Sequence, residues 1–356
     1  MIAVVKVGTS SITDDHGSID RAAIDKVCDE LASARADGHR VVLVTSAAIA
    51  AGLPALGLTA TRRPRDARTL QAVSAVGQAL LMATYNESFA RHGVVAGQVL
   101  LAPLDFVVRA QYLHARSTLE RLFELDVIPI VNENDAVADD EIRFGDNDRI
   151  AALVAQLVGA DALVLLTDAP GLLTADPRLD AEASLIEDVQ VVDAELEALA
   201  GGSGSNRGSG GMATKLAAAK IAAWSGVRTV IASSHRSDVV RDALASTPGV
   251  GTIVWPRDRR LPARKVWIAF AVAPCGRVVV DDGARAALER DSSLLAAGVR
   301  SVDGTFDAGD AIEIHDLRGE VVAKGLARCA ASDLRSGTER GVVVHRDDLV
   351  VLSSLG

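Results

Sequence analysis

Over the first 256 residues, short runs of β-branched and aliphatic residues alternate with longer segments of helical periodicity. The segment after the first run places Ile24, Val27, Cys28 and Leu31 on one helical face, and Gly38 ends it. Strands that alternate with helices predict an α/β fold, with a mostly parallel central sheet sandwiched by helices. Strands are expected at residues 2–7, 40–46, 127–133, 162–168 and 228–233.

The pattern changes at residues 255–262, where two prolines and a cluster of charges interrupt it. Beyond this stretch, short apolar runs separated by turn residues predict a small β-rich domain. We therefore expect two domains, at residues 1–256 and 263–350, as the length of 356 residues also suggests. In the second domain, strands are expected within residues 265–270, 276–283, 309–316, 319–328 and 342–352.

The composition narrows the class of protein. Hydrophobic residues make up 49% of the chain and aromatic residues only 3%, which suits a core of aliphatic side chains around buried parallel strands. A formal net charge of -10 argues against sequence-independent binding to nucleic acid. Three scattered cysteines, no signal-peptide pattern and no apolar run near the ~18 residues of a membrane helix predict a cytoplasmic protein without membrane attachment.

Polar residues stand where four of the expected strands end. Ligands of open parallel sheets bind beyond the carboxyl ends of the strands, so these residues are candidates for a site. Lys6 lies inside an otherwise apolar strand, and the alternative is an edge-strand lysine with its ammonium group in water. The candidates are Lys6 to Ser10, Thr45 and Ser46, Asn132 to Asp135, and Thr167 and Asp168.

Two further segments begin helices with unusual residues. Asp146, Asn147 and Asp148 precede an apolar helix, where simple capping is the alternative explanation. The glycine-rich stretch 201–211 is either a flexible spacer or an anion-binding approach to the helix that contains Lys215. A lysine in the first turn of a helix is disfavoured by the helix dipole, and a bound phosphate would offset that cost.

Other catalytic patterns are missing from the sequence. The seven histidines show no metal-ligand spacing, so we expect no metal site built from protein residues. There is no G-x-S-x-G motif, and no G-x-G-x-x-G follows the first strand, which argues against dinucleotide chemistry.

Seven motifs taken together are similar to those of a known family. The chain resembles the glutamate 5-kinase family of the amino acid kinase superfamily, and its C-terminal part resembles a PUA domain. The motifs are VVKVGTSSIT (4–13), VVLVTSAAIAAG (41–52), QAVSAVGQALL (71–81), IPIVNENDAV (128–137), GDNDRIAALVA (145–155), LLTDAPGLLTADPR (165–178) and GSGGMATKLAAA (208–219).

The resemblance implies ATP-dependent phosphorylation of the side-chain carboxylate of L-glutamate, the first step of proline biosynthesis, with Mg²⁺ carried mainly by the phosphates. It implies that Lys6 and Lys215 flank the transferred phosphoryl group and that Asp148 holds both lysines. Ser46, Asp135 and Asn147 match the glutamate-binding positions of the family. The matching ATP-binding positions are Lys6, Thr167, Asp168, Ser209, Gly210, Gly211, Met212, Ala213, Thr214 and Lys215.

The resemblance also implies a homo-oligomer, a dimer or tetramer, and feedback inhibition by proline through residues 136–148. One departure concerns Ala47, where the family has glycine. We expect a negative φ at Ala47, which makes its methyl group harmless; a positive φ would put glutamate affinity or proline inhibition in question.

Two alternatives stay open. The first is another kinase of the superfamily, for aspartate or N-acetylglutamate, although the PUA-like domain and the paired motifs at 132–137 and 145–148 argue against it. The second is an accessory RNA-binding role of the PUA-like domain. Residues 263–356 contain 12 Lys and Arg against 14 Asp and Glu and show no basic stripe, which argues against this role.

Overall fold

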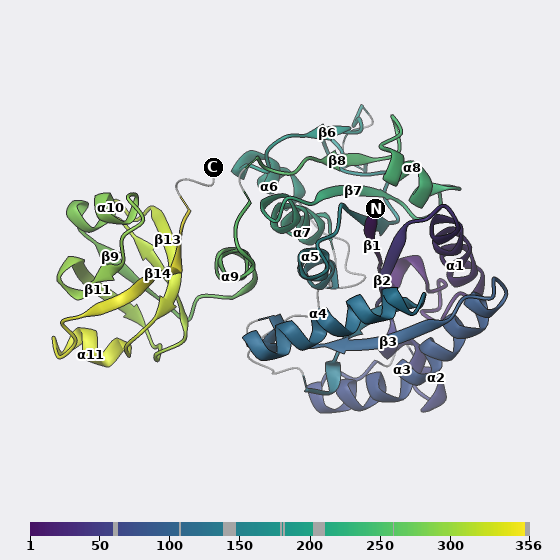
Figure 1. Ribbon diagram of the computed structural model, residues 1–356, viewed down its shortest axis with the longest axis horizontal. Helices are drawn as coiled ribbons and strands as arrows, with labels where there is room; N and C mark the ends of the chain where they lie inside the picture. Colours follow the sequence, from purple (N-terminus) through teal and green to yellow (C-terminus); the bar gives the residue numbers. More distant parts are fainter. Residues whose placement is uncertain are drawn as a thin grey trace. The chain divides into compact units, whose positions relative to one another are not determined.

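The computed structural model divides into two compact units, Met1–Arg260 and Leu261–Gly356. It is drawn in Figure 1, and each unit is described by itself. The structure describes residues 1–59, 63–106, 108–137, 147–178, 180, 182–201, 211–258 and 260–352.

The first unit is built on an eight-stranded sheet formed by the described residues, in the order β3-β4-β2-β1-β5-β7-β8-β6. Neighbouring strands run parallel except for β7 and β8, so the expected mostly parallel sheet is confirmed. The strands are β1 (Ile2–Val7), β2 (Arg40–Val44), β3 (Ala96–Leu101), β4 (Ile128–Glu133), β5 (Ala162–Thr167), β6 (Asp188–Val189), β7 (Arg228–Ser233) and β8 (Thr252–Val254).

The five strands expected in this unit are present, and three strands were missed. β3, β6 and β8 lie toward the two edges of the sheet. β3 has only one fully buried residue, Leu101, and therefore lacks the continuous apolar run of a central strand. β6 and β8 are two and three residues long, too short to show a period.

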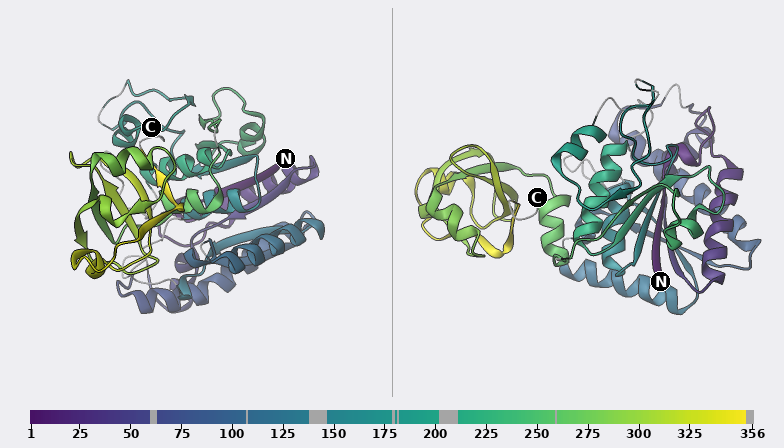
Figure 2. Two further views of the ribbon diagram at one scale, coloured as in Figure 1. Left: turned by 60° about the vertical axis from the view of Figure 1, so that its left-hand side comes forward. Right: turned by 90° about the horizontal axis from the view of Figure 1, so that it is seen from above.

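Helices cover both faces of this sheet, as the two views of Figure 2 show. They are α1 (Arg21–Ala36), α2 (Ala48–Ala55), α3 (Ala67–Ala90), α4 (Arg109–Glu124), α5 (Asn147–Leu157), α6 (Ala194–Ala200), α7 (Met212–Trp224) and α8 (Val239–Ala245). The predicted helix at α1 is confirmed: the Asp20 carboxylate accepts hydrogen bonds from its first amides, and Ile24, Val27, Cys28 and Leu31 are buried. Among the described residues, no helix has both the length and the apolar character needed to cross a membrane.

Alternation along β1 separates the two faces. Ala3, Val5 and Val7 belong to one core cluster with side chains of α1, α3 and α8. Since successive strand residues point to opposite faces, Lys6 points away from this cluster, to the side where its ammonium group meets α5. The sheet therefore places one lysine on the α5 side of its most buried region.

Helices α2 and α3 approach each other very closely. A Cβ atom built on Gly77 of α3 would lie 1.8 Å from the carbonyl oxygen of Ala48, and one on Gly52 of α2 would lie 2.1 Å from that of Val73. No side chain fits at either position, so the two glycines set the distance between the helices. This crossing fixes the amino-terminal half of α3 against the segment that follows β2.

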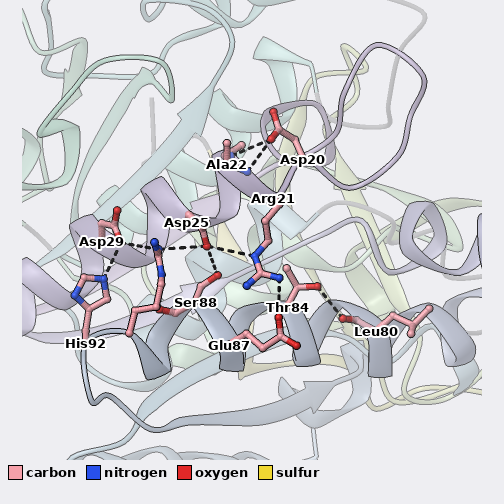
Figure 3. Close-up of polar contacts among 12 residues, drawn as sticks. Asp20, Arg21, Ala22, Asp25, Asp29, Leu80, Thr84, Glu87, Ser88 and His92 are labelled. Atoms are coloured by element: carbon pink, nitrogen blue, oxygen red, sulfur yellow. Dashed lines mark hydrogen bonds and ion pairs between the residues drawn. The ribbon is translucent and has the colours of Figure 1, made fainter.

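A polar network joins the other half of α3 to α1 (Figure 3). The Ser88 hydroxyl donates to Asp25, and the Arg21 guanidinium forms an ion pair of 2.7 Å with Glu87. His92 Nε2 lies 2.7 Å from Asp29 Oδ1. α3 is therefore held at one end by a glycine crossing and at the other by side-chain contacts with α1.

In the second unit, the described residues form a six-stranded sheet in the order β10-β14-β13-β12-β9-β11 and a core cluster of their own. Its pairs are antiparallel except for β9 with β12. Its elements are α9 (Ala263–Val266), a π-helix (Trp267–Ala271), β9 (Gly276–Val280), α10 (Asp282–Leu288), β10 (Leu294–Leu295), β11 (Val299–Gly304), β12 (Ala311–His315), β13 (Val321–Ala327), α11 (Ala331–Arg335) and β14 (Val342–Val351).

The expected strand at residues 265–270 was wrong, because this segment forms α9 and the π-helix. Its alternation of Val266, Ile268 and Phe270 resembles a strand, but so short an apolar run does not distinguish strand from buried helix. In the structure Val266 and Ile268 are both buried, and the Lys324 ammonium group of β13 donates to the carbonyl oxygens of Ala269 and Val272.

Candidate active site

Lys6 lies in the centre of the sheet, because β1 pairs with β2 on one side and β5 on the other. Its side chain is 5% exposed. The alternative of an edge-strand lysine in water is therefore excluded. Burying an ammonium group carries a large desolvation cost unless a counter-charge is near.

That counter-charge is Asp148, in the first turn of α5. Its carboxylate is 0% exposed and lies 2.5 Å from Lys6 Nζ and 3.1 Å from Lys215 Nζ. Burial opposes ionisation of this carboxyl group, but the two ammonium groups hold the pKa of Asp148 below its ordinary value. Asp148 is thus engaged by two lysines, which simple capping of α5 does not explain.

Lys215 reaches the same carboxylate from the first turn of α7. The neighbouring Thr214 hydroxyl also contacts Asp148, with Oγ1 to Oδ2 at 2.9 Å. Two ammonium groups thus meet at one buried carboxylate. Such a cluster suits an anion whose negative charge increases during a reaction.

Gly8 follows β1 and Gly211 precedes α7, so the backbone next to each lysine-bearing element lacks a side chain there. A Cβ on Gly8 would lie 3.5 Å from Lys6 Nζ, and no described atom lies within 4 Å of a Cβ on Gly211. Gly211 is the N-cap of α7 and has no side chain, and no side chain in the described part of the protein caps this helix, a terminus of the kind that suits an anion such as phosphate. Met212 and Ala213 begin α7, whereas Ser209, Gly210 and Asp146 lie outside the described residues.

Thr167 and Asp168 lie at the carboxyl end of β5, the strand next to β1. The Thr167 hydroxyl donates to Asp168 Oδ1 at 3.0 Å, and the Thr167 carbonyl accepts from the Ser234 amide beyond β7. Thr167 is buried and Asp168 is exposed. The pair therefore presents a carboxylate to solvent at the edge of the sheet where Lys6 and Lys215 meet Asp148.

Ser46 and Asn147 belong to a network of hydrogen-bonded side chains that extends to α3. Asn147 Nδ2 donates to Ser46 Oγ at 2.9 Å and to Asn132 Oδ1 at 3.2 Å. Asn132 Nδ2 in turn donates to Gln78 Oε1 of α3 at 2.8 Å. Asn147 Oδ1 is buried and has no hydrogen-bond partner among the described residues, so it is an unsatisfied acceptor.

Asp135 begins a 3₁₀ turn (Asp135–Val137) after β4 and contacts α3 by a hydrogen bond of its own. Its Oδ2 accepts a hydrogen bond from the hydroxyl of Ser74. Partial burial raises the pKa of Asp135, while the Ser74 hydroxyl and the positive charge of Arg63 oppose the rise. Asp135 is thus an acidic group kept in contact with a helix and close to the strand end that contains Asn132.

The expectation of a negative φ at Ala47 was wrong. Ala47 follows Ser46 and adopts φ 75°, in the left-handed region. This conformation costs an alanine about 1–2 kcal/mol relative to glycine, because its Cβ crowds the backbone. Ala47 is the N-cap of α2, so the left-handed conformation falls where the chain passes from β2 into α2.

Sequence reasoning singled out none of three side chains of α3 that support the site; Asn132, which Gln78 contacts, was among the strand-end candidates. Ser74, Gln78 and Tyr85 all lie on α3, where Tyr85 OH meets Thr45 Oγ1 at 2.7 Å, and Asn132 links Gln78 to Asn147. The motif that contains Ser74 and Gln78 was recognised as part of the resemblance. Their spacing of four residues, one helical turn, was the available signal for a shared face.

Two family models match this chain. The model of the amino acid kinase family matches residues 1–233, and that of the PUA domain matches residues 276–348. In the solved carbamate kinase from Giardia lamblia bound to AMP-PNP, 98% of the chain superposes on 72% of this one, with a TM-score of 0.52 at 16% identity, which shows the fold alone.

The chain belongs to the amino acid kinase family. Within it, proteins similar to this chain over nearly its whole length are glutamate 5-kinases. That of Pelobacter propionicus is 43% identical over 98% of this chain and 97% of its own, and that of Paraburkholderia xenovorans is 46% identical over the same shares.

Proposed function

We propose that this kinase transfers the γ-phosphoryl group of ATP to the side-chain carboxylate of L-glutamate and forms L-glutamyl 5-phosphate, the first step of proline biosynthesis. The observation that carries the proposal is the buried contact of Lys6 and Lys215 with one carboxylate, Asp148. Glutamate is proposed as the substrate because relatives 43–46% identical to this chain are glutamate 5-kinases.

The reaction needs charge neutralisation rather than proton transfer. A side-chain carboxylate is already ionised at neutral pH, so attack on phosphorus requires no general base. It does require two anions to be brought together in line, and phosphoryl transfer depends chiefly on positioning and electrostatic stabilisation. Lys6 and Lys215 would supply positive charge from opposite elements, while Asp148 fixes both ammonium groups.

The acceptor side is proposed to lie among Ser46, Asp135 and Asn147. The Asp135 carboxylate is a suitable partner for the ammonium group of an amino acid. Asn147 Oδ1, which is buried without a partner among the described residues, would accept a further hydrogen bond from this substrate. These two acceptors, which come from separate elements, would set the substrate's orientation relative to the lysines.

The nucleotide is proposed to bind at the amino terminus of α7 and the end of β5. The residues are Lys6, Thr167, Asp168 and 209–215, of which 209 and 210 lie outside the described residues. When bound, Mg²⁺ would neutralise phosphate charge, and it commonly binds through phosphates and water with one or two carboxylates. Among the described residues, no three His, Cys, Asp or Glu side chains come together to hold a metal ion.

The proposal extends to the protein's compartment, assembly and regulation. Cys28, Cys275 and Cys329 form no disulfide in the described part of the chain, which suits a reducing cytoplasm. A homo-oligomer and inhibition by proline follow from the resemblance alone, and residues 138–146 of the proposed feedback segment lie outside the described residues. The domain division proposed from sequence would assign catalysis to residues 1–256 and a separate, unassigned role to residues 263–350.

The acceptor can be tested by trapping the product. An acyl phosphate reacts with hydroxylamine to give a coloured hydroxamate complex with iron, so the purified protein is incubated with ATP, Mg²⁺ and one acceptor at a time. We expect hydroxamate with L-glutamate and little with L-aspartate or N-acetyl-L-glutamate. Activity with aspartate alone would reject glutamate as the substrate.

A further inference from the structure

Two polar side chains of helix α3 form hydrogen bonds with residues at the proposed acceptor site. Ser74 and Gln78 are one turn apart and are 4% and 8% exposed. The Ser74 hydroxyl donates to Asp135, and Gln78 accepts from Asn132, whose own oxygen accepts from Asn147. Two of the three residues proposed to contact the amino acid are therefore anchored to the same helix.

The helix is a rigid support. Gly77, between Ser74 and Gln78, packs directly against the backbone of α2, and the Ser88–Asp25 contact secures the far half against α1 (Figure 3). A hydroxyl group on such an element has a well-defined position. Asp135, by contrast, lies in a short turn that leads into residues outside the described part of the chain.

We propose that Ser74 is a positioning residue for the amino acid substrate, because its hydroxyl fixes the orientation of the Asp135 carboxylate. The hydrogen bond occupies Oδ2 and leaves Oδ1 for the substrate ammonium group. This inference rests on the proposed function, in which Asp135 contacts that ammonium group. Ser74 itself does not contact the reacting atoms.

Ser74 also favours the charged form of Asp135. Burial raises the pKa of this carboxyl group, and the Ser74 hydroxyl and Arg63 lower it. Arg63 is the charged residue among those described whose field acts on Asp135. Loss of the hydroxyl leaves burial less opposed, so the carboxylate becomes protonated at a higher pH and stops attracting an ammonium group there.

The chain offers a matched control. Ser88 lies on the same helix, is buried, and also donates its hydroxyl to an aspartate, Asp25 of α1. Ser74→Ala and Ser88→Ala therefore remove the same group and the same kind of hydrogen bond. Only Ser74 contacts a residue proposed to bind substrate. A general loss of helix packing would therefore change the kinetics of both variants, whereas a positioning role predicts a change only in Ser74→Ala.

The experiment measures kcat and KM for L-glutamate and for ATP in the wild-type protein and in both variants. We expect Ser74→Ala to raise the KM for glutamate about tenfold, with kcat and the KM for ATP within about twofold of wild type, because a hydrogen bond to a charged group is lost. The acid limb of its kcat/KM profile for glutamate should move to higher pH. Ser88→Ala should leave all these values near wild type, and Ser74→Thr should restore the KM.

Measurements in an Asp135→Asn background separate the proposed role of Ser74 from the proposed glutamate kinase activity. There, adding Ser74→Ala should change the KM for glutamate less than twofold, because the carboxylate on which Ser74 acts is gone. If Asp135→Asn raises the KM but Ser74→Ala does not, the role of Ser74 is wrong and the proposed function stands. If the wild-type protein shows no glutamate-dependent turnover, the proposed function itself fails. Equal KM changes in Ser74→Ala and Ser88→Ala would reduce Ser74 to a structural residue.

Discussion

Lys6 and Lys215, 209 positions apart in the chain, place their ammonium groups on the two oxygens of one buried carboxylate. Lys6 Nζ lies 2.5 Å from Asp148 Oδ1, and Lys215 Nζ lies 3.1 Å from Asp148 Oδ2. A central strand and a helix amino terminus thereby present positive charge to the same place. This relationship turns separate sequence motifs into one site.

Removing either ammonium group should lower turnover far more than affinity. We expect Lys6→Ala and Lys215→Ala each to reduce kcat about 10²–10³-fold, the range found when one donor to a developing anion is lost. Steady-state release of ADP with saturating glutamate measures the effect. Turnover near the wild-type rate in either variant would remove that lysine from the proposed mechanism.

Asp148 should matter for stability as well as for catalysis. Asp148→Asn removes the carboxylate charge that both buried ammonium groups contact, which should lower the free energy of unfolding by about 3–5 kcal/mol. Because the lysines hold the pKa of Asp148 low despite burial, its contribution is present above the ordinary carboxyl pKa and is lost as pH falls through the lowered value.

Urea unfolding of the wild-type protein and Asp148→Asn over a pH series measures this contribution. The difference between them should be largest near neutral pH and shrink in acid. A difference that stays constant down to the acid transition would show that the ion pairs contribute little.

The charge of Asp135 should lower the stability of the folded protein, in contrast to that of Asp148. Burial raises its pKa despite Ser74 and Arg63, so its charged form is less favourable in the folded protein than in the unfolded chain. Asp135→Asn is therefore expected to raise stability at neutral pH, with the gain disappearing below the ordinary carboxyl pKa, while it weakens glutamate binding. Lower stability at neutral pH in the variant would contradict the direction of this pKa shift.

The left-handed backbone at Ala47 gives a prediction about stability. Ala47→Gly relieves the crowding of the Cβ at φ 75° and should raise the free energy of unfolding by about 1 kcal/mol, after the greater flexibility of glycine in the unfolded chain is subtracted. Thermal and urea unfolding measure the change. A destabilised variant would mean that packing of the buried methyl group outweighs the backbone strain.

The contact between α2 and α3 should control substrate binding from a distance. Gly77→Ala places a Cβ 1.8 Å from the Ala48 carbonyl oxygen, so the helices must separate, and Ser74 and Gln78 move with α3. We expect a loss of about 3 kcal/mol in stability and a higher KM for glutamate.

Ala79→Gly, at an exposed position of the same helix, is the control for Gly77→Ala. It should cost about 1 kcal/mol without changing the KM. An unchanged KM in Gly77→Ala would show that the acceptor site does not depend on this crossing.

The sequence carried enough information for the central strands and for the residues at their ends. Lys6 is prominent because an apolar strand seldom contains a buried charge, and the helix beginning at Asn147 is strongly periodic. Ala47 could not be interpreted correctly, because φ depends on the turn between β2 and α2 and not on the residue alone. Ser74 and Gln78 look like ordinary helix residues until α3 is placed beside β4, and the segment at 265–270 is too short to show its period.

The most direct test of the central claim follows an oxygen atom. L-Glutamate labelled with oxygen-18 in its side-chain carboxylate is incubated with the enzyme, ATP and hydroxylamine, and the released inorganic phosphate is analysed by mass spectrometry. If the carboxylate attacks the γ-phosphorus between Lys6 and Lys215, hydroxylamine then displaces phosphate at the acyl carbon. The phosphate must then carry one oxygen-18 atom for each hydroxamate formed. Hydroxamate accompanied by unlabelled phosphate would contradict this account.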